Sequence, residues 1–498
     1  MNRSRLNLIT AGILLSLFLA SMEGTVVSTA MPSIVGQLGG LSIYAWVFSI
    51  YMLTSTISVP IYGKLSDLFG RKRVYIVSML FFMAGSLLCA QARSMDQLIV
   101  FRAVQGLGAG GILPLAFIII GQLFTFEQRA KMQGIFSGVW GVSAVVGPLI
   151  GGFLVDQISW HWVFYINILP GLLACALVWF AWQEDKRGAV QVRIDFAGAG
   201  VLTAGAPLLL LGLNELGSPL GAGMVALAAA LFGALIWIER RAPDPILPLD
   251  FFRDRLFTVT ILHGVFAGMA VFGSISYVPL FVQAVLGTSA TQAGIALMPM
   301  SLSWTISSVF GTQLLLRVGY RSLALGGMTV LLVGAFFLAR VGASTSQAAV
   351  MLFTGMMGVG MGFSVPAFLI AVQSAVPKNR LGAATATIQF SRSIGGALGV
   401  SILGAVLSAS LNARLLAAGI DPAGVALASL LDPLARAGAQ MEGALEKALA
   451  NALGGALGAA FLLAFGAAAA AFAAVFFAPK GKIARTDKAS GAVDALPE

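Results

Sequence analysis

Long apolar runs recur along the whole sequence, and they restrict the possible folds more than any other feature. A helix needs about 20 mostly apolar residues to cross a bilayer. We expect fourteen such helices, at residues 8–29, 44–63, 74–91, 98–120, 133–155, 162–182, 196–214, 219–238, 257–281, 291–316, 322–341, 347–373, 384–408 and 454–478. Apolar residues make up 58% of the 498 residues and charged residues only 10%, too few charges to cover the surface of a water-soluble protein. The sequence therefore predicts an all-α integral membrane protein and excludes a soluble enzyme, a disordered chain and a coiled coil.

The Lys and Arg residues are distributed unevenly between the two ends of these spans. With both termini on one side, that side holds most of the 30 basic residues. The other side holds Arg93, Arg340, Arg414, Arg436 and Lys447. Cytoplasmic loops of membrane proteins carry such an excess, so we expect both termini in the cytoplasm. The net charge of +10 then reflects the orientation of the loops and does not indicate a nucleic-acid partner.

A short repeat divides the chain into two halves. The pattern G-x-G-x-x-x-P occurs at residues 108–114 and again, 252 residues later, at 360–366. Parallel repeats of this kind are typical of transporters that bind substrate between two halves. We expect a first six-helix bundle at 1–185 and a second at 256–480, with two inserted helices and their linkers at 186–255.

Two further segments stand apart from the predicted spans. A long loop on the outer side covers about 409–453, and its spaced acidic residues leave two interpretations open, an amphipathic helix and a solvated spacer. Residues 481–498 form a polar tail that we expect in the cytoplasm.

An acidic residue inside the first span is the first candidate for chemistry. Glu23 is the acidic residue that lies well inside a predicted span, where a carboxylate costs a few kcal/mol and usually faces a cavity. Burial penalises the charged form, so such a group can bind or release a proton as its access to water changes. This behaviour suits a proton carrier. The alternative is a carboxylate that snorkels to the outer end of span 1.

Two polar residues in the fourth span form the second candidate. Arg102 is an intramembrane cation, and Gln105 lies one turn further along the same helix face. Arg102 could favour the ionised form of Glu23 through space, which would couple proton release to a conformational change. The alternative is that Arg102 pairs with carbonyl groups at helix ends.

The loop after span 2 combines glycines, an acid and a basic cluster. It contains Gly63, Asp67, Gly70, Arg71 and Arg73. The glycines allow tight turns where helices end, and the carboxylate of Asp67 can accept charge-assisted hydrogen bonds. We expect a cytoplasmic latch that holds helix ends together in one conformation. The alternative is a basic loop that only sets topology.

With these motifs in place, the sequence resembles the major facilitator superfamily. The stretch GKLSDLFGRKR at 63–73 is similar to that superfamily's G-x-L-x-D-x-x-G-R-K/R loop, and RAVQGLG at 102–108 to its R-x-x-Q-G-x-G. Residues 23–32 and 160–167 resemble stretches of its fourteen-span drug:proton antiporters. The resemblance implies two six-helix bundles plus two additional central helices.

Span 5 resembles the antiporter motif of the same superfamily. The matching residues are Gly134, Gly147, Pro148, Gly151 and Gly152, and Ser143 replaces the motif's middle glycine. Glycine and proline at these positions let helices approach closely and bend. We expect both close packing and a gating hinge. The motif implies export rather than uptake.

Several other polar and aromatic residues are candidates for a substrate cavity. They are Gln105, Trp46, Tyr51, His263, Tyr277, Trp304, Gln389 and Arg392. Each has a simpler alternative. The lone His263 could be a packing residue, Arg392 could snorkel to the cytoplasmic end of its span, and the aromatic rings could be core or lipid-facing.

The sequence also limits the energy source and the cofactors. It contains no G-x4-G-K-[ST] nucleotide loop, no H-E-x-x-H and no G-x-S-x-G. Two cysteines and two histidines are too few for a disulfide framework or a metal centre built from them. We therefore expect no cofactor and no metal, and a proton gradient as the energy source.

The functional prediction follows from these features and the resemblance. It is a monomeric, proton-coupled antiporter of a bacterial-type inner membrane that exports amphipathic, cationic drug-like compounds by alternating access. One alternative is export of an endogenous lipid or lipid-linked molecule. Another, from a different class, is a non-transporting membrane sensor or enzyme.

Overall fold

The computed structural model describes residues 3–123, 126–183, 195–214, 218–242, 249–376, 381–420 and 443–480, which form helices and no strand. The α-helices are α1 (Arg3–Leu38), α2 (Tyr44–Phe69), α3 (Arg71–Cys89), α4 (Met95–Leu123), α5 (Phe126–Gln157), α6 (Trp162–Tyr165), α7 (Ile168–Ala181), α8 (Phe196–Asn214), α9 (Pro219–Glu239), α10 (Arg255–Leu280), α11 (Ala290–Val318), α12 (Tyr320–Leu338), α13 (Gln347–Ala375), α14 (Leu381–Ala417) and α16 (Gly443–Phe476). Short 3-10 turns lie at Leu41–Ile43 and Leu249–Arg253, and a π turn at Phe281–Val285 extends α10.

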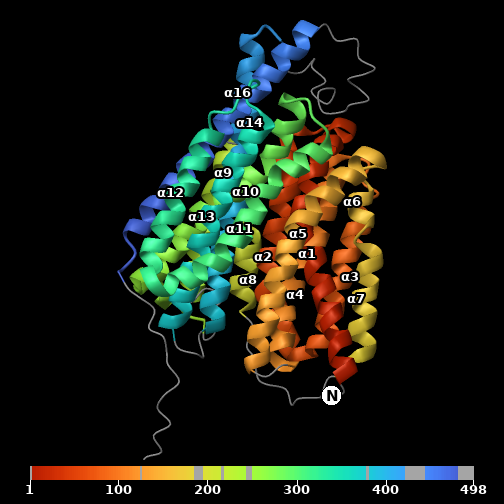
Figure 1. Ribbon diagram of the computed structural model, residues 1–498, viewed down its shortest axis with the longest axis vertical. Coiled ribbons are helices and arrows are strands. Elements are labelled where there is room, and N and C mark those ends of the chain that lie inside the picture. The colour runs from red at the N-terminus through yellow and green to blue at the C-terminus, as the bar shows by residue number, and fades with distance from the viewer. Residues whose placement is uncertain are drawn as a thin grey trace, which may run out of the picture.

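The long helices lie side by side, with the first helices of the chain on one side and the later ones on the other (Figure 1). We call the end at which α1 begins the near face and the end at which α1 finishes the far face. The N-terminus marks the near face at the bottom of Figure 1. Successive long helices alternate in direction between the two faces, so α16 returns the chain to the near face.

Twelve of the described helices are long and apolar enough to cross a membrane. The predicted all-helical membrane class is thus confirmed. The count of fourteen is not confirmed. In α2 and α8 the described residues give apolar stretches of Tyr44–Val59 and Gly200–Leu213, which are shorter than this measure requires.

The predicted loop at 409–453 is partly helix, since α14 continues to Ala417 and α16 begins at Gly443. Residues 421–442, on which the choice between amphipathic helix and spacer depends, lie outside the described residues, as does the tail at 481–498.

Local sequence sets the ends of several helices. Ser218, Asp254, Ser289 and Ser346 precede α9, α10, α11 and α13, and each accepts a hydrogen bond from a backbone N–H of the first turn, as N-cap residues do. Two equivalent tight turns, between α2 and α3 and between α11 and α12, are made by Gly70 (φ 91°) and Gly319 (φ 82°). A positive φ of this size favours glycine.

The repeated glycines pack α4 and α13 in equivalent ways. A Cβ added to Gly108 would lie 2.1 Å from the backbone of α3, and one added to Gly110 would lie 2.0 Å from a side chain of α2. A Cβ added to the corresponding Gly360 would lie 2.4 Å from a side chain of α12, and one added to Gly362 would lie 1.9 Å from a side chain of α11. The two halves therefore share a local packing pattern. The residue limits of the domains stay a prediction.

Hydrogen bonds between the two sides of the molecule lie toward the far face. The hydroxyl of Tyr44 donates to the carbonyl of Ser276 at 2.6 Å, and the amide of Gln283 donates to the carbonyl of Thr29 at 3.1 Å. Tyr44 also stacks on Tyr277, with ring centroids 5.3 Å apart. These contacts close the far face between α1, α2 and α10.

Helix α8 covers the seam between the two sides. Leu202 and Leu210 of α8 share a buried apolar cluster with Leu53 of α2 and Ala397 of α14. This inserted helix is thus packed against both the first and the second group of helices.

Candidate functional site

Glu23 lies in the interior of the first group of helices. Its side chain is 1% exposed, and α1 continues to Leu38, about 22 Å further at 1.5 Å per residue. The carboxylate is therefore far from a helix end and faces other helices. This placement contradicts the alternative in which Glu23 snorkels to the membrane surface.

Arg102 of α4 is the direct partner of Glu23. Its Nη1 lies 2.5 Å from Oε1 of Glu23, and both side chains are 1% exposed. The guanidinium also donates from Nη1 to Oε1 of Gln105 at 2.7 Å and from Nε to the carbonyl of Val47 at 3.2 Å. Its Cζ lies 4.0 Å from the centre of the Tyr51 ring. Three of the predicted residues, Arg102, Gln105 and Tyr51, are therefore brought together around Glu23.

Asn167 completes this cluster, although the sequence pattern did not single it out as a site residue. Its Nδ2 donates to Oε2 of Glu23 at 3.0 Å and to Oγ of Ser86 in α3 at 2.9 Å. The chain leaves the short helix α6 just before Asn167 and starts α7 just after it, which turns the amide inward. The available signal was its place at the end of the stretch 160–167.

The Glu23–Arg102 pair is stable only while both groups keep their charge. Removing one partner of a buried ion pair typically costs about 3–5 kcal/mol, because the other charge is left uncompensated. Protonation of Glu23 has the same consequence for Arg102. Loss of the charge on Glu23 would therefore weaken the contact between α1 and α4.

The antiporter motif of α5 forms two close helix contacts. A Cβ added to Gly147 or Gly151 would lie 2.4 Å from a hydroxyl oxygen of α1. A Cβ added to Gly152 would lie 2.4 Å from Cα of Thr291 in α11. In the other direction, a Cβ added to Gly294 of α11 would lie 2.4 Å from the carbonyl oxygen of Pro148. The motif therefore joins α1, α5 and α11, and the α5–α11 contact links the two sides of the molecule.

The antiporter motif has two further positions, Ser143 and Gly134. Ser143, which replaces a glycine, is hydrogen-bonded to Ser21 of α1 through their hydroxyl oxygens at 2.6 Å, so a small polar side chain keeps the helices close. Gly134 lies within α5, but its surroundings are outside the described residues.

Asp156, at the far end of α5, adds a polar tie to the same interface. Its carboxylate accepts hydrogen bonds from the backbone N–H groups of Ala290 at 3.1 Å and Thr291 at 2.9 Å, and from the Thr291 hydroxyl. An acidic group at a helix N-terminus is favourable. Asp156 thus caps α11 from the other side of the molecule.

The predicted latch at 63–73 is only partly described. Gly70 makes the turn between α2 and α3 with φ 91°, Arg71 is half-buried and Arg73 is exposed. Gly63 and Asp67 lie within α2, and the side chain of Asp67 is outside the described residues. The latch stays a prediction.

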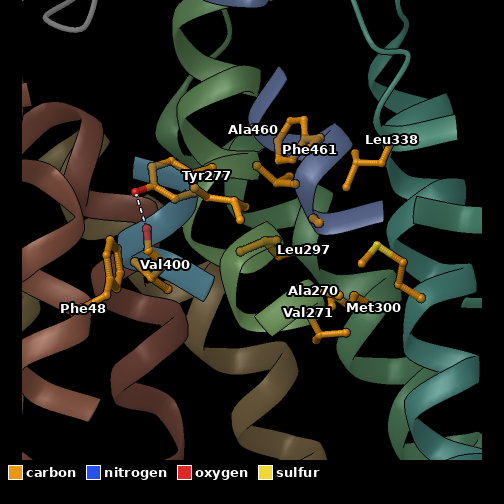
Figure 2. Close-up of a cluster of buried hydrophobic side chains, with 14 of the residues drawn as sticks. Phe48, Ala270, Val271, Tyr277, Leu297, Met300, Leu338, Val400, Ala460 and Phe461 are labelled. Carbon is orange, nitrogen blue, oxygen red and sulfur yellow. Dashed lines mark hydrogen bonds between the residues drawn. The ribbon is translucent and has the colours of Figure 1, made fainter. Parts of the chain in front are cut away.

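Three of the remaining cavity candidates are packed in helix interfaces. Trp46 is 8% exposed and belongs to the cluster that includes α8. Tyr277 is fully buried, and its hydroxyl donates to the carbonyl of Val400 at 2.9 Å (Figure 2). His263 packs on Phe368 with ring centroids 5.0 Å apart. In this conformation these three residues do not line an open cavity.

The other cavity candidates are more accessible. Trp304 is half-buried, with its ring 6.4 Å from that of Phe272. Arg392 donates to Oε1 of Gln389, one turn before it, at 2.7 Å. None of these three contacts the Glu23 cluster among the interactions of the described residues.

The helical fold and a buried acid–base pair at its centre define a polytopic membrane transporter rather than an enzyme. The chain belongs to the Major Facilitator Superfamily, whose sequence profile matches residues 13–400. The resemblance carried by the motifs is thereby confirmed.

Relatives and solved structures agree with this assignment. The chain is 40% identical over 413 residues to the multidrug transporter protein MdtP of Bacillus subtilis (strain 168), covering 82% of this chain and 76% of the relative. It is 38% identical over 405 residues to multidrug resistance protein 3 of the same organism, covering 80% and 79%. Its fold is similar to that of a bacterial homologue of the human lysosomal transporter Spinster, with a TM-score of 0.71 and 18% identity, over 96% of this chain and 98% of that one.

Proposed function

We propose that the protein exports amphipathic, cationic drug-like compounds from the cytoplasm in exchange for protons. The observation that carries this proposal is the Glu23–Arg102 pair, which is 1% exposed and also held by Asn167. The family and the multidrug transporters among its relatives support the substrate class. The protein acts as a monomer in a bacterial-type inner membrane, and its near face is the cytoplasmic one, as the basic residues of the sequence indicate.

The cycle uses the two protonation states of Glu23. With the far face closed by the contacts of Tyr44, Gln283 and Asp156, substrate enters from the near face. A cationic substrate competes with Arg102 for the ionised carboxylate. After the far face opens, a proton from outside neutralises Glu23, and the substrate loses its electrostatic partner and leaves. Return to the closed far face and release of the proton to the cytoplasm complete the exchange.

Everted membrane vesicles test this proposal, because export then appears as uptake into the lumen. Ethidium, tetraphenylphosphonium and a fluorescent phospholipid are offered to vesicles with an acidified lumen. We expect uptake of the two cations by the wild type and none by Glu23→Gln, whose melting temperature serves as a folding control. Full gradient-driven uptake by Glu23→Gln would contradict the role of Glu23. Uptake of the phospholipid alone would replace the proposed substrate class by a lipid.

A further inference from the structure

The amide of Asn167 has one end fully engaged and one end free. Its Nδ2 donates both hydrogens, to Oε2 of Glu23 at 3.0 Å and to Oγ of Ser86 at 2.9 Å. Its Oδ1 is buried and lacks a hydrogen-bond partner among the residues that the structure describes. Buried polar atoms in proteins nearly always have a partner. A free acceptor beside a candidate proton carrier therefore needs a functional explanation.

The observed orientation of the amide fits one protonation state of Glu23. An ionised carboxylate only accepts hydrogen bonds, and it receives them here from Arg102 and from the NH2 group of Asn167. A protonated carboxyl carries an O–H that must donate. With the proton on Oε2, this O–H would face the N–H of Asn167, and two donors would oppose each other.

We propose that Asn167 is a positioning residue that serves both protonation states of Glu23 by turning its amide. It donates from Nδ2 to the ionised carboxylate and, after half a turn about the Cβ–Cγ bond, accepts from the protonated carboxyl at Oδ1. Asn167 neither gains nor loses a proton: the proton arrives on Glu23 from one side of the membrane and leaves to the other. This inference rests on the proposed proton exchange at Glu23.

The other groups around Glu23 are less suited to this task. Gln105 already accepts at Oε1 from Arg102, at 2.7 Å, and from the thiol of Cys89, at 3.8 Å. The charged and titratable groups facing the site from the other helices are Arg102 of α4, Tyr51 of α2 and Cys89 of α3. Arg102 can only donate.

Turning the amide changes one hydrogen bond of the neighbouring network. Ser86 donates to the carbonyl of Phe164 at 2.9 Å and accepts from Gln105 at 3.2 Å. Its hydroxyl can rotate to donate to Oδ1 of Asn167 when the amide has turned, and it then gives up its hydrogen bond to Phe164. The carbonyl of Phe164 still accepts from the backbone N–H of Asn167, at 3.2 Å. The turn therefore costs one side-chain hydrogen bond, and it leaves the carbonyl of Phe164 with a partner.

Proteoliposomes with tetraphenylphosphonium as the probe test this inference through two readouts, uptake driven by a pH gradient and exchange of the probe without a gradient. In Asn167→Leu the amide is replaced by an apolar group of similar shape. We expect driven uptake to fall at least tenfold, while exchange at pH 8 stays within twofold, because ionised Glu23 keeps Arg102. A protonated Asp offers an O–H and a C=O, as the amide does, so Asn167→Asp should recover driven uptake at pH 5.5 and lose it at pH 8.

A control variant separates the turning amide from a general loss of packing around Glu23. Ser78→Ala removes another fully buried hydroxyl of α3, one that donates to the carbonyl of Tyr75 at 2.8 Å and not to the amide, and it should leave the pH profile unchanged. The inference is wrong if Asn167→Leu drives uptake within twofold of the wild type, if it loses driven uptake and exchange equally, or if Asn167→Asp matches Asn167→Leu at every pH. Glu23→Gln isolates the proposed function: gradient-driven uptake by that variant would overturn the proton exchange itself. Inactive Glu23→Gln together with wild-type behaviour of Asn167→Leu would overturn only the role of Asn167.

Discussion

A single methyl group added at Gly152 should open the far face. The added Cβ would lie 2.4 Å from Cα of Thr291 in α11, whereas carbon atoms normally approach to about 3.5–4.0 Å, so α5 and α11 must separate by roughly 1 Å. Overpacking of this kind typically costs about 1–3 kcal/mol. The contact joins the two sides of the molecule, so the cost falls on the conformation whose far face is closed. The equilibrium should shift toward the open far face by about 5–150-fold.

Two glycines of the same helix provide matched controls for Gly152→Ala. A Cβ added to Gly151 would also lie 2.4 Å from its neighbour, but this neighbour belongs to α1, within the same group of helices. Gly151→Ala should therefore lower the melting temperature without favouring either conformation. Gly138 has nothing within 4 Å of an added Cβ. Gly138→Ala should therefore leave the conformational equilibrium unchanged, and it should stabilise the protein by up to about 1 kcal/mol through helix propensity.

Electron paramagnetic resonance distances between spin labels can measure this shift. Gln157 and Ser344 are exposed positions on the far face, one on each side of the molecule. We expect Gly152→Ala to increase the population with the longer distance. A distance distribution equal to that of the wild type, or the same shift in Gly151→Ala, would refute the reasoning.

Three further predictions concern single residues. Asp156→Asn keeps the shape but removes the negative charge at the N-terminus of α11, so the same spin labels should report a more open far face, by about twofold to fivefold for about 0.3–1 kcal/mol. Ser289→Ala removes the N-cap that directly precedes α11, and it should lower the melting temperature without opening that face. Arg102→Lys keeps the charge but loses the forked contacts to Glu23, Gln105 and Val47, so driven efflux of ethidium should fall at least about tenfold, and normal efflux would show that charge alone suffices. Burial lowers the pKa of His161, which lies just before α6, from 6.5; its neutral form is favoured in the folded protein, so His161 contributes stability that is lost as the pH falls below 6.5, and a ring resonance titrating above 6.5 would contradict this.

The apolar pattern of the sequence locates the helices well, but it underestimates the length of a helix that packs against other helices. The pattern predicts a span at 196–214, and α8 has the same limits. It predicts the first span at 8–29, whereas α1 extends over Arg3–Leu38, and residues beyond the predicted end, such as Ile34 and Val35, are buried against other helices. A hydropathy pattern reports contact with lipid, so it ends a helix too early where the helix faces protein. The same effect places Glu23 too close to a membrane surface when only the sequence is considered.

The candidate site was predictable where a residue carries a charge and less so where its role depends on distant partners. Glu23 and Arg102 stand out because charges are rare in spans. Asn167 is uncharged, and it acquires its place from a helix break and from a carboxylate 144 positions earlier in the sequence. Tyr277 is a reasonable candidate for a cavity wall, but its hydroxyl donates a hydrogen bond to the carbonyl of Val400 and its ring is packed between helices. Aromatic residues in a span do not by their spacing distinguish a wall from a packed interface.

Proton release on substrate binding tests the central claim most directly. Purified protein in weakly buffered detergent solution receives tetraphenylphosphonium, and a pH indicator records the protons released per molecule. If Glu23 exchanges its proton for the cation, the wild type releases protons at pH values where part of the population is protonated, and Glu23→Gln releases none. Equal release by both proteins would contradict the account.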